Sequence, residues 1–479
     1  MEQNKGKFDS NFGFLMASLG SAVGLGNLWG FPYKMGLGGG FAFLLLYMIL
    51  LVVVGYPLIL SEIAIGRKSQ KAAIEAYKEI HPGFTFNGVL QTIVPFFLIA
   101  FYCTFGGYVM KYFFKSLGMF AGNQFDPGAT FGETLVNTSS VVWVLIFLAL
   151  TVIIVLGGVS GGIEKFCKVA MPALFIMLVV IVIRSCTLNG AGEGIAFLFK
   201  PHFEGLNSVG SFFETLKLAG SQMFFSLSLA SGCLIAYGSY LDKKENLEKD
   251  AVIVAVGDTC AALLAGLAIM PACSAFGIDF GAGPGLLFVS MPTVFNDMKG
   301  GAIFAFLFWL LVFFACLSSS IGMMEGGISA ILDSRIKAGK SANRFGVTMV
   351  MAAWALIGNM MTTLDGLGER TTMQWFHLFG IPDVLDVWDA VAEGILMPLT
   401  GLIMAILIGW VVPHYIDDEV ESSSAFKSKG FFNFCIKWLG PIFMALIDWG
   451  QIQSVISLTQ GSTLSKYFSI KSPGSVRDF

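Results

Sequence analysis

The sequence predicts an all-α integral membrane protein with about eleven transmembrane helices. Ten of them are expected to form a five-plus-five inverted repeat in which helices one and six are broken. Hydrophobic residues make up 55% of the chain and charged residues only 13%, and the mean hydropathy is +0.75. Soluble domains carry about 25% charged residues. This composition is therefore typical of a chain embedded in a bilayer.

Apolar runs long enough to cross a bilayer recur eleven times along the sequence. A span of about 30 Å needs roughly 20 apolar residues in a helix. The last run is the weakest, because Lys437 and Asp448 interrupt it. The first run has no small-residue cleavage site, so it is not predicted to be a signal peptide. The eleven runs lie near 12–36, 41–66, 88–117, 140–158, 168–188, 211–240, 250–278, 300–332, 345–364, 389–413 and 431–456.

Basic residues predict the orientation of these spans. Of the 29 lysines and arginines, 17 fall before span one or after an even-numbered span. Cytoplasmic loops are enriched in such residues, so we expect the N-terminus in the cytoplasm, the C-terminus outside, and location in the cell (inner, plasma) membrane. The expected regions are a cytoplasmic segment (1–11), the first repeat (12–190), the second repeat (191–416), a cytoplasmic loop with span eleven (417–457) and a polar tail (458–479).

Several function classes find no support in the sequence. The eight cysteines lie mostly in or beside apolar spans without paired spacing, so neither a disulfide nor a redox site is predicted. The four histidines lie outside the central spans, and no Ser-His-acid arrangement, metal cluster or phosphate loop is found. We therefore expect no enzyme, and the net charge of -3 gives no sign of a nucleic-acid partner. The expected surroundings are lipid, with the chain a monomer or a weak oligomer.

Span one contains an interruption at 20–27, with the sequence GSAVGLGN. Glycine in a helix interior costs about 1 kcal/mol relative to alanine. Unpaired backbone groups survive in a membrane only where they line a protein cavity or a bound ion. This segment is therefore predicted to be unwound at a binding site.

Span six carries a second interruption at 226–232, with the sequence SLSLASG. Two broken spans at matching places in two five-helix halves indicate an inverted-repeat transporter whose site lies at the bilayer midplane. The alternative is that the serines bond to their own helix and the glycines only let helices approach. Finding both interruptions five helices apart favours the transporter.

Long motifs in the chain resemble the neurotransmitter:sodium symporter family, in its bacterial amino-acid-transporting branch. The motifs are GSAVGLGNLWGFPY (20–33), GYPLILSEIAIGR (55–67), GGIEKFCKVAMPALF (161–175), QMFFSLSLASG (222–232) and FFACLSSSIGMMEG (313–326). The resemblance implies a bundle of spans 1, 2, 6 and 7 that rocks against a scaffold, and sodium-driven uptake by alternating access.

An amino acid zwitterion suits two broken helices, because half-helix N-termini attract a carboxylate and unwound carbonyls attract an ammonium group. By resemblance, the amides of Leu25 and Gly26 bind the carboxylate, and carbonyls near Ala22, Phe225 and Ser226 bind the amine. Family members that carry monoamines have an aspartate at the position of Gly24, so this glycine favours a substrate with its own carboxylate. The implied pocket wall consists of Leu98, Tyr102, Phe225, Ser228, Ser231, Ser319 and Met323.

Two positions in this wall bear on substrate choice. Relatives specific for small aliphatic amino acids have a phenylalanine where this chain has Ser231. A serine enlarges the pocket, so a bulky or aromatic substrate is our hypothesis. The resemblance also implies that Tyr102 bonds the substrate carboxylate and forms an outer lid with Phe225.

Sodium prefers oxygen ligands, and the resemblance implies two sodium sites. The first comprises Ala22, Asn27, Ser226 and a residue of span seven, where the family usually has asparagine and this chain has Asp258. A carboxylate there would replace the anion that chloride-dependent relatives need, so transport independent of chloride is expected. The alternative is that Asp258 caps span seven on the cytoplasmic side. The second site comprises Gly20, Val23, Ala315, Ser318 and Ser319.

The resemblance also implies gates on both sides of the site. Lys5 and Asp333 match the cytoplasmic gate, with Tyr240 nearby, and Glu62 is expected to brace the unwound part of span one. On the outer side the family's arginine is replaced by Gly30, so its ion pair with the acid at Asp389 cannot form. Lys34, one turn further on, either substitutes for that arginine or is an ordinary interfacial lysine.

The leading interpretation is a sodium-coupled amino acid symporter. The open alternatives are a sensor-like or channel-like member of the family without tight coupling, and a proton-coupled amino acid transporter that uses Asp258, Glu62 or Glu325.

Overall fold

The computed structural model describes residues 6–278, 280 and 283–459, and within these ranges the chain forms helices and no strands. The all-helical fold is as the sequence predicts. Most of the polar tail expected at 458–479, and the gate residue Lys5, lie outside the described residues.

Span one is broken where the glycines predict it. Helix α1 (Asn11–Ala22) ends before a short unwound stretch at 23–24, and the chain continues as the π-helical turn η1 (Gly26–Gly30) and α2 (Phe31–Leu37). The two halves are bent by 48°. Ser10 caps the start of α1 through its side chain, which accepts a hydrogen bond from the amide of Gly13.

Span six is also broken. Helix α11 (Val209–Ser226) and helix α12 (Cys233–Gly238) are separated by a non-helical stretch at 227–232. Three residues of this stretch have left-handed backbone: Ser228 (φ 52°), Ala230 (φ 53°) and Gly232 (φ 71°). Left-handed backbone costs a non-glycine residue roughly 1–2 kcal/mol, so packing and hydrogen bonds must hold this break in place.

The other helices run through the predicted spans and their connections. They are α3 (Phe41–Leu50), α4 (Tyr56–Ser69), α5 (Ala73–Ile80), α6 (Thr85–Met119), α7 (Pro127–Val136), α8 (Ser140–Leu156), α9 (Lys165–Cys186), α10 (Ala191–Phe199), α13 (Leu247–Ala275), α14 (Met291–Asp297), α15 (Gly301–Lys337), α16 (Arg344–Asp365), α17 (Val384–Asp389), α18 (Met397–Ile406), α19 (Tyr415–Glu421), α20 (Lys429–Phe434) and α21 (Gly440–Thr459). Within the described residues, eight helices are long and apolar enough to cross a membrane, or ten if each bent pair is one span. The count of eleven therefore stays a prediction.

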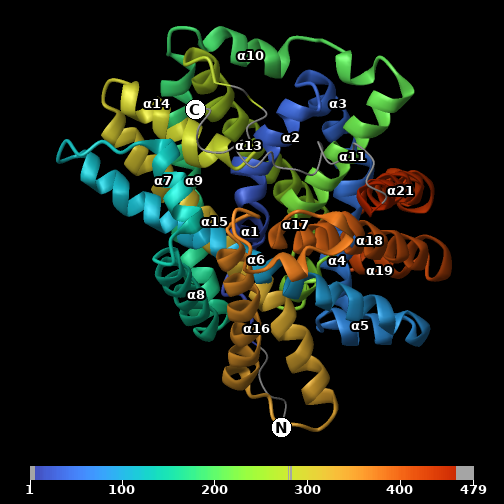
Figure 1. Cartoon of the computed structure of the whole chain (residues 1–479). Coiled ribbons are helices and arrows are strands. Elements are labelled where there is room, and N and C mark those ends of the chain that lie inside the picture. Colours follow the sequence, from blue (N-terminus) through green and yellow to red (C-terminus); the bar gives the residue numbers. More distant parts are fainter. Residues whose placement is uncertain (1–5, 279, 281–282, 460–479) are drawn as a thin grey trace.

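Three helices form the middle of the molecule. Helices α6 and α15 are 35 and 37 residues long and pack against each other, and α1 packs on α15 (Figure 1). Helices α7, α8 and α9 lie on one side of this centre, and α18, α19 and α21 lie on the other (Figure 1). This arrangement places both breaks deep in the fold.

Candidate substrate and ion site

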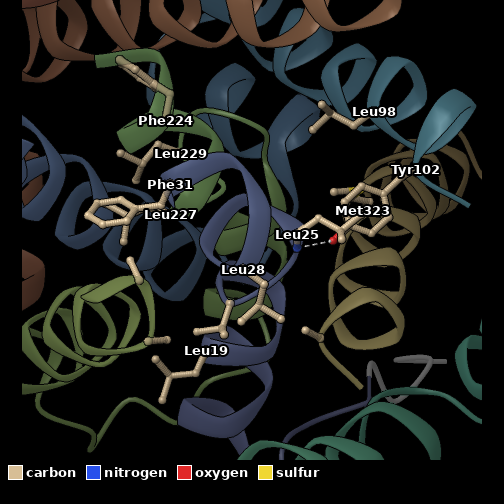
Figure 2. Close-up of a cluster of buried hydrophobic side chains, with 14 of the residues drawn as sticks. Leu19, Leu25, Leu28, Phe31, Leu98, Tyr102, Phe224, Leu227, Leu229 and Met323 are labelled. Carbon is tan, nitrogen blue, oxygen red and sulfur yellow. Dashed lines mark hydrogen bonds between the residues drawn. The ribbon is translucent and has the colours of Figure 1, made fainter. Parts of the chain in front are cut away.

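The unwound part of span one is held by its own asparagine. The side chain of Asn27 is fully buried, and its Oδ1 accepts the amide hydrogen of Gly24 at 3.0 Å. The amide of Leu25 donates to the hydroxyl of Tyr102 on α6 at 3.1 Å, drawn as a dashed line in Figure 2. The Leu25 amide of the break thus points toward α6.

A carboxylate joins the two breaks. Asn27 Nδ2 donates to Asp258 Oδ1 at 2.7 Å and to Ser226 Oγ at 2.9 Å, and Ser226 Oγ donates to Asp258 Oδ2 at 2.9 Å. Asp258 is fully buried in α13, eleven residues after that helix begins at Leu247. The capping alternative is wrong, because the N-cap of α13 is Asn246. The structure instead brings Asp258 together with Asn27 and Ser226.

Gly24 lies where no side chain fits. A Cβ at this position would be 2.3 Å from Ser319 Oγ on α15 and 2.6 Å from the Tyr102 hydroxyl on α6. Tyr102 and Met323 reach the break from these two neighbouring helices, and Leu98 lies further along α6 (Figure 2). All three of these side chains are at most 4% exposed.

Serine side chains of the second break face inward. Ser228 Oγ donates to the carbonyl of Ser21 in α1 at 3.0 Å, and Ser231 Oγ donates to the carbonyl of Ser228 at 2.6 Å. Ser231 is fully buried. The hydroxyls thus tie the second break to the first and to itself.

Glu62 requires a correction. We expected it to brace the unwound part of span one, but its Oε1 accepts the amide hydrogen of Ala230 in the break of span six. The carboxyl group is fully buried in α4. Its partner differs because α4 packs on α12, the short helix that follows this break.

The five residues expected at the second sodium site come from α1, its break and α15. Ser319 Oγ donates to the carbonyls of Gly20 at 3.2 Å and Val23 at 3.4 Å, and Ser318 Oγ donates to the carbonyl of Ala315 at 3.1 Å. A Cβ at Gly20 would meet Ser318 Cβ at 3.0 Å, so this glycine lets the two helices approach. Hydroxyl and carbonyl oxygens of the kind that bind sodium therefore gather here.

A cavity of about 550 Å³, which we call the vestibule, lies beside η1 and α2, the second half of span one. Its walls include Tyr33, Lys34, Phe225, Asp386, Asp389 and Glu393. Phe225 lines the vestibule, whereas Tyr102 is only 1% exposed. Of the two predicted lid residues, Phe225 thus faces the vestibule and Tyr102 does not line it.

Lys34 forms an ion pair in the vestibule wall. Its ammonium group pairs with Glu393 of span ten, donates to Ser221 Oγ at 3.3 Å, and lies 6.0 Å from the centre of the Phe225 ring. The side chains of Lys34 and Glu393 are 17% and 5% exposed. Asp389, the expected acidic partner, lies within electrostatic reach of both. Lys34 thus has a carboxylate partner, Glu393, which lies one turn beyond the predicted acid Asp389.

Asp383 lies at the start of α17, near the acidic wall of the vestibule. Its Oδ1 accepts the amide hydrogen of Asp386 at 2.7 Å and caps α17. Burial raises the pKa of Asp383 to about 6, because the charged form is separated from water.

Packing closes the side opposite the vestibule. The ring of Phe8 contacts Phe14, Tyr237 and Tyr240 edge-on. The hydroxyl of Tyr240 donates to Glu325 Oε1 at 2.9 Å. Asp333 Oδ2 accepts the amide hydrogen of Ala72 at 2.6 Å, and its predicted partner Lys5 lies outside the described residues.

Sequence reasoning missed several partners of these residues. Tyr47 places its hydroxyl 3.5 Å from Asp258 Oδ2, and Gln222 Nε2 donates to the carbonyl of Gly26 at 2.7 Å. Arg344 pairs with Glu325 beneath Tyr240 at 2.5 Å. Glu393, the partner of Lys34, was also not predicted. The one available signal was the rarity of ionisable residues inside membrane spans, which marks Glu325 and Glu393 as candidates.

Comparison with known proteins identifies the family. The model of the sodium:neurotransmitter symporter family matches residues 5–122 and 129–469. The chain belongs to the sodium:neurotransmitter symporter family. The protein is thus a multi-span membrane transporter of a sodium-coupled family, and not an enzyme.

Relatives within the sodium:neurotransmitter symporter family support this. The sodium-dependent transporter YhdH of Bacillus subtilis is 35% identical over 412 residues, 85% of this chain and 88% of YhdH. The mouse sodium-dependent neutral amino acid transporter B(0)AT3 is 30% identical, over 70% of this chain and 68% of its own. A crystal structure of MhsT in complex with L-phenylalanine matches with a TM-score of 0.84 and 32% identity, and covers 94% of this chain and 100% of MhsT.

Proposed function

We propose that this protein is a sodium-coupled symporter that imports an amino acid with a large apolar or aromatic side chain, independently of chloride. The observation that carries the proposal is the junction of the two breaks, where Asn27, Ser226 and Asp258 hydrogen-bond to one another below the Leu25 amide and Tyr102. The substrate carboxylate would bind at the amides of Leu25 and Gly26 and at the Tyr102 hydroxyl. Its ammonium group would bind at carbonyls near Ala22, Phe225 and Ser226.

The charge of Asp258 supports independence from chloride. One sodium ion at Ala22, Asn27 and Ser226 brings one positive charge into a buried region, and the zwitterion brings no net charge. A buried charge is costly unless it is paired. The carboxylate of Asp258 lies where it can neutralise that ion, so an added anion has no role. The second sodium ion would bind where Ser318 and Ser319 face the carbonyls of Gly20, Val23 and Ala315.

Two observations support a large substrate side chain: the serine at position 231 and the match to MhsT. Ser231 is buried at the second break, where a serine occupies less volume than a phenylalanine. MhsT, which matches nearly the whole chain, was crystallised with L-phenylalanine. B(0)AT3 is by name a neutral amino acid transporter. Leu98 and Met323 would contact the apolar side chain.

Closure of the outer side would use the Lys34–Glu393 pair together with Tyr102 and Phe225. The pair links the outer half of span one to span ten, and the lysine also lies beside the Phe225 ring. The vestibule then faces the outside and the N-terminus faces the cytoplasm of the cell, in agreement with the distribution of basic residues. In the cytoplasmic gate, Asp333 and Tyr240 would separate from the N-terminal segment when the site opens inward.

Uptake into proteoliposomes with an inward sodium gradient tests the proposal. We expect accumulation of radiolabelled L-phenylalanine against its gradient, with L-tryptophan, L-tyrosine and L-leucine competing better than glycine or alanine. Replacing chloride with gluconate should leave the rate within twofold. Flux without accumulation would favour the channel-like alternative, and accumulation driven by a proton gradient in the absence of sodium would favour proton coupling.

A further inference from the structure

Four buried polar side chains gather behind the break of span six. Glu62 lies on α4, Tyr77 on α5, and Asn87 and Gln91 on α6, and each is 0% exposed. Tyr77 lies next to Asn87 and Gln91 and within electrostatic reach of Glu62. We call this group the α4–α6 polar cluster. None of its members is placed in the substrate or sodium sites.

Five atoms of this cluster have no partner in hydrogen-bond geometry within the described part of the chain, although the Tyr77 hydroxyl lies close to the side chains of Asn87 and Gln91. They are Glu62 Oε2, Tyr77 Oη, Asn87 Oδ1 and both terminal atoms of Gln91. A buried polar atom without a partner destabilises the folded state, because it has lost its hydrogen bonds to water and gained none in return. Folded proteins leave few such groups, and a set of them in one place indicates a bound water or ion.

The chemistry of the five atoms distinguishes water from a cation. Glu62 Oε2, Asn87 Oδ1 and Gln91 Oε1 accept hydrogen bonds, Gln91 Nε2 only donates them, and the Tyr77 hydroxyl does both. A metal cation would serve the oxygen atoms and leave Gln91 Nε2 unsatisfied. A water molecule donates two hydrogen bonds and accepts two, so it serves both kinds of atom. We propose that the α4–α6 polar cluster is a binding site for structural water that supports the hinge of span six.

The hinge residue is Ala230, whose left-handed backbone is held from two sides. Its amide donates to Glu62 Oε1, and its carbonyl accepts a hydrogen bond from Thr400 Oγ1 at 2.9 Å. The carbonyl of Thr400 in turn accepts a hydrogen bond from Asn87 Nδ2 at 3.1 Å. Glu62 and Asn87 therefore each use one polar atom to hold Ala230, directly or through Thr400, and leave the other for the water.

Gln91 places the site next to the start of α12. A Cβ at Gly232 would lie 3.3 Å from Ala73 Cβ and 3.4 Å from the carbonyl oxygen of Gln91. The water would thus fix the free ends of Glu62 and Asn87 at the point where span six resumes its helix. Without it, both side chains lose a partner and hold Ala230 less firmly. This role does not depend on which amino acid is transported.

A high-resolution structure of the full chain gives the direct test. We expect solvent density within hydrogen-bond distance of Glu62 Oε2 and of at least two of Tyr77 Oη, Asn87 Oδ1 and Gln91. Crystals soaked in thallium(I) should show no anomalous peak there. A thallium peak, or direct hydrogen bonds that satisfy these atoms without solvent, would overturn the proposal.

Hydrogen exchange measures the effect on the hinge. Gln91→Met removes the amide with little change in volume, and Tyr77→Phe removes only the hydroxyl. We expect amide exchange at 228–232 to be at least tenfold faster in Gln91→Met and about threefold faster in Tyr77→Phe. Tyr108→Phe is the matched control, because Tyr108 is also fully buried with an unpartnered hydroxyl but packs against Phe105 and Phe288. Its exchange at 228–232 should stay within twofold of wild type. Unchanged exchange in Tyr77→Phe, which keeps the packing intact, would contradict the proposal even if Gln91→Met failed to fold.

Discussion

A single methyl group at Gly24 should disable the central site. In Gly24→Ala the new Cβ would lie 2.3 Å from Ser319 Oγ and 2.6 Å from the Tyr102 hydroxyl. Contacts under 3.0 Å cannot persist, so the side chains of Ser319 and Tyr102, or the helices that carry them, must shift away from span one. The atoms displaced are those that bond the Leu25 amide at 3.1 Å and the Gly20 carbonyl at 3.2 Å.

The size of the effect follows from two contributions. Inserting a methyl group into a packed core costs about 1–3 kcal/mol. Losing the hydrogen bonds of Tyr102 and Ser319 costs about 1 kcal/mol each. A combined loss of about 3–5 kcal/mol corresponds to a roughly 150- to 4,000-fold weaker binding of the substrate.

The assay is sodium-dependent binding of L-phenylalanine to the purified protein, with the thermal midpoint measured in parallel. Gly192→Ala is the matched control, because a Cβ at Gly192 meets no atom within 4 Å. We expect the control to bind like wild type. Binding by Gly24→Ala within twofold of wild type would refute the reasoning, because Tyr102 and Ser319 would then not contact the ligands through this face.

Three further changes test separate parts of the site. Asp258→Asn should weaken the apparent affinity for sodium at least tenfold and make uptake respond to chloride. Sodium titrations of uptake in chloride and in gluconate measure both effects, and an unchanged titration would exclude a role of this carboxylate in sodium binding. Lys34→Met and Glu393→Gln should each speed substrate release several-fold, with a coupling energy of about 1–2 kcal/mol in a double-mutant cycle; additive effects would contradict the gate. Asp383→Asn should flatten the pH dependence of thermal stability. Burial raises the pKa of Asp383 to about 6, so its ionisation destabilises the folded state and wild type should lose stability as the pH rises from about 4 through 6.

The fold was predictable because its signals are local. Lengths of apolar runs set the spans, and the glycines and serines of 20–27 and 226–232 mark the two breaks. The count was less certain, because several spans contain bent or short pieces. Helix α12 has six residues and follows six non-helical ones, so the outer and inner parts of span six do not resemble a single apolar helix.

The site was predictable where a motif fixes the position of a residue relative to a break. Asn27, Tyr102 and Ser319, which the family motifs place at the site, each hydrogen-bond to backbone in or beside the first break. For Asp258 the sequence left open a role as a helix cap. The packing of α13 against span one excludes this role, because it places Asp258 inside the helix and beside the first break. The partner of Glu62 was predicted wrongly, because whether α4 faces the break of span one or that of span six depends on tertiary packing.

The Lys34–Glu393 pair could not be predicted from sequence, because its two residues are 359 positions apart. Charges three or four residues apart on one helix can be paired from the sequence alone. Pairs between distant spans depend on how each helix is rotated. Glu393 and Asp389 are one turn apart on the same helix, and only the structure shows which of them Lys34 meets.

Gly30 fits the arrangement around Lys34 and Glu393, so the absence of the family's arginine at this position is more than the loss of an ion-pair partner. A Cβ at Gly30 would lie 2.9 Å from Gln222 Oε1, and Gln222 Nε2 donates to the carbonyl of Gly26. An arginine at position 30 would therefore have to displace the side chain that joins span six to the unwound part of span one. Moving the positive charge one turn outward to Lys34 leaves the Gln222 contact in place and still supplies a cation to the acidic wall of the vestibule. The amide of Gln222 thus holds span one to span six, and the ammonium group of Lys34 pairs with a carboxylate of span ten.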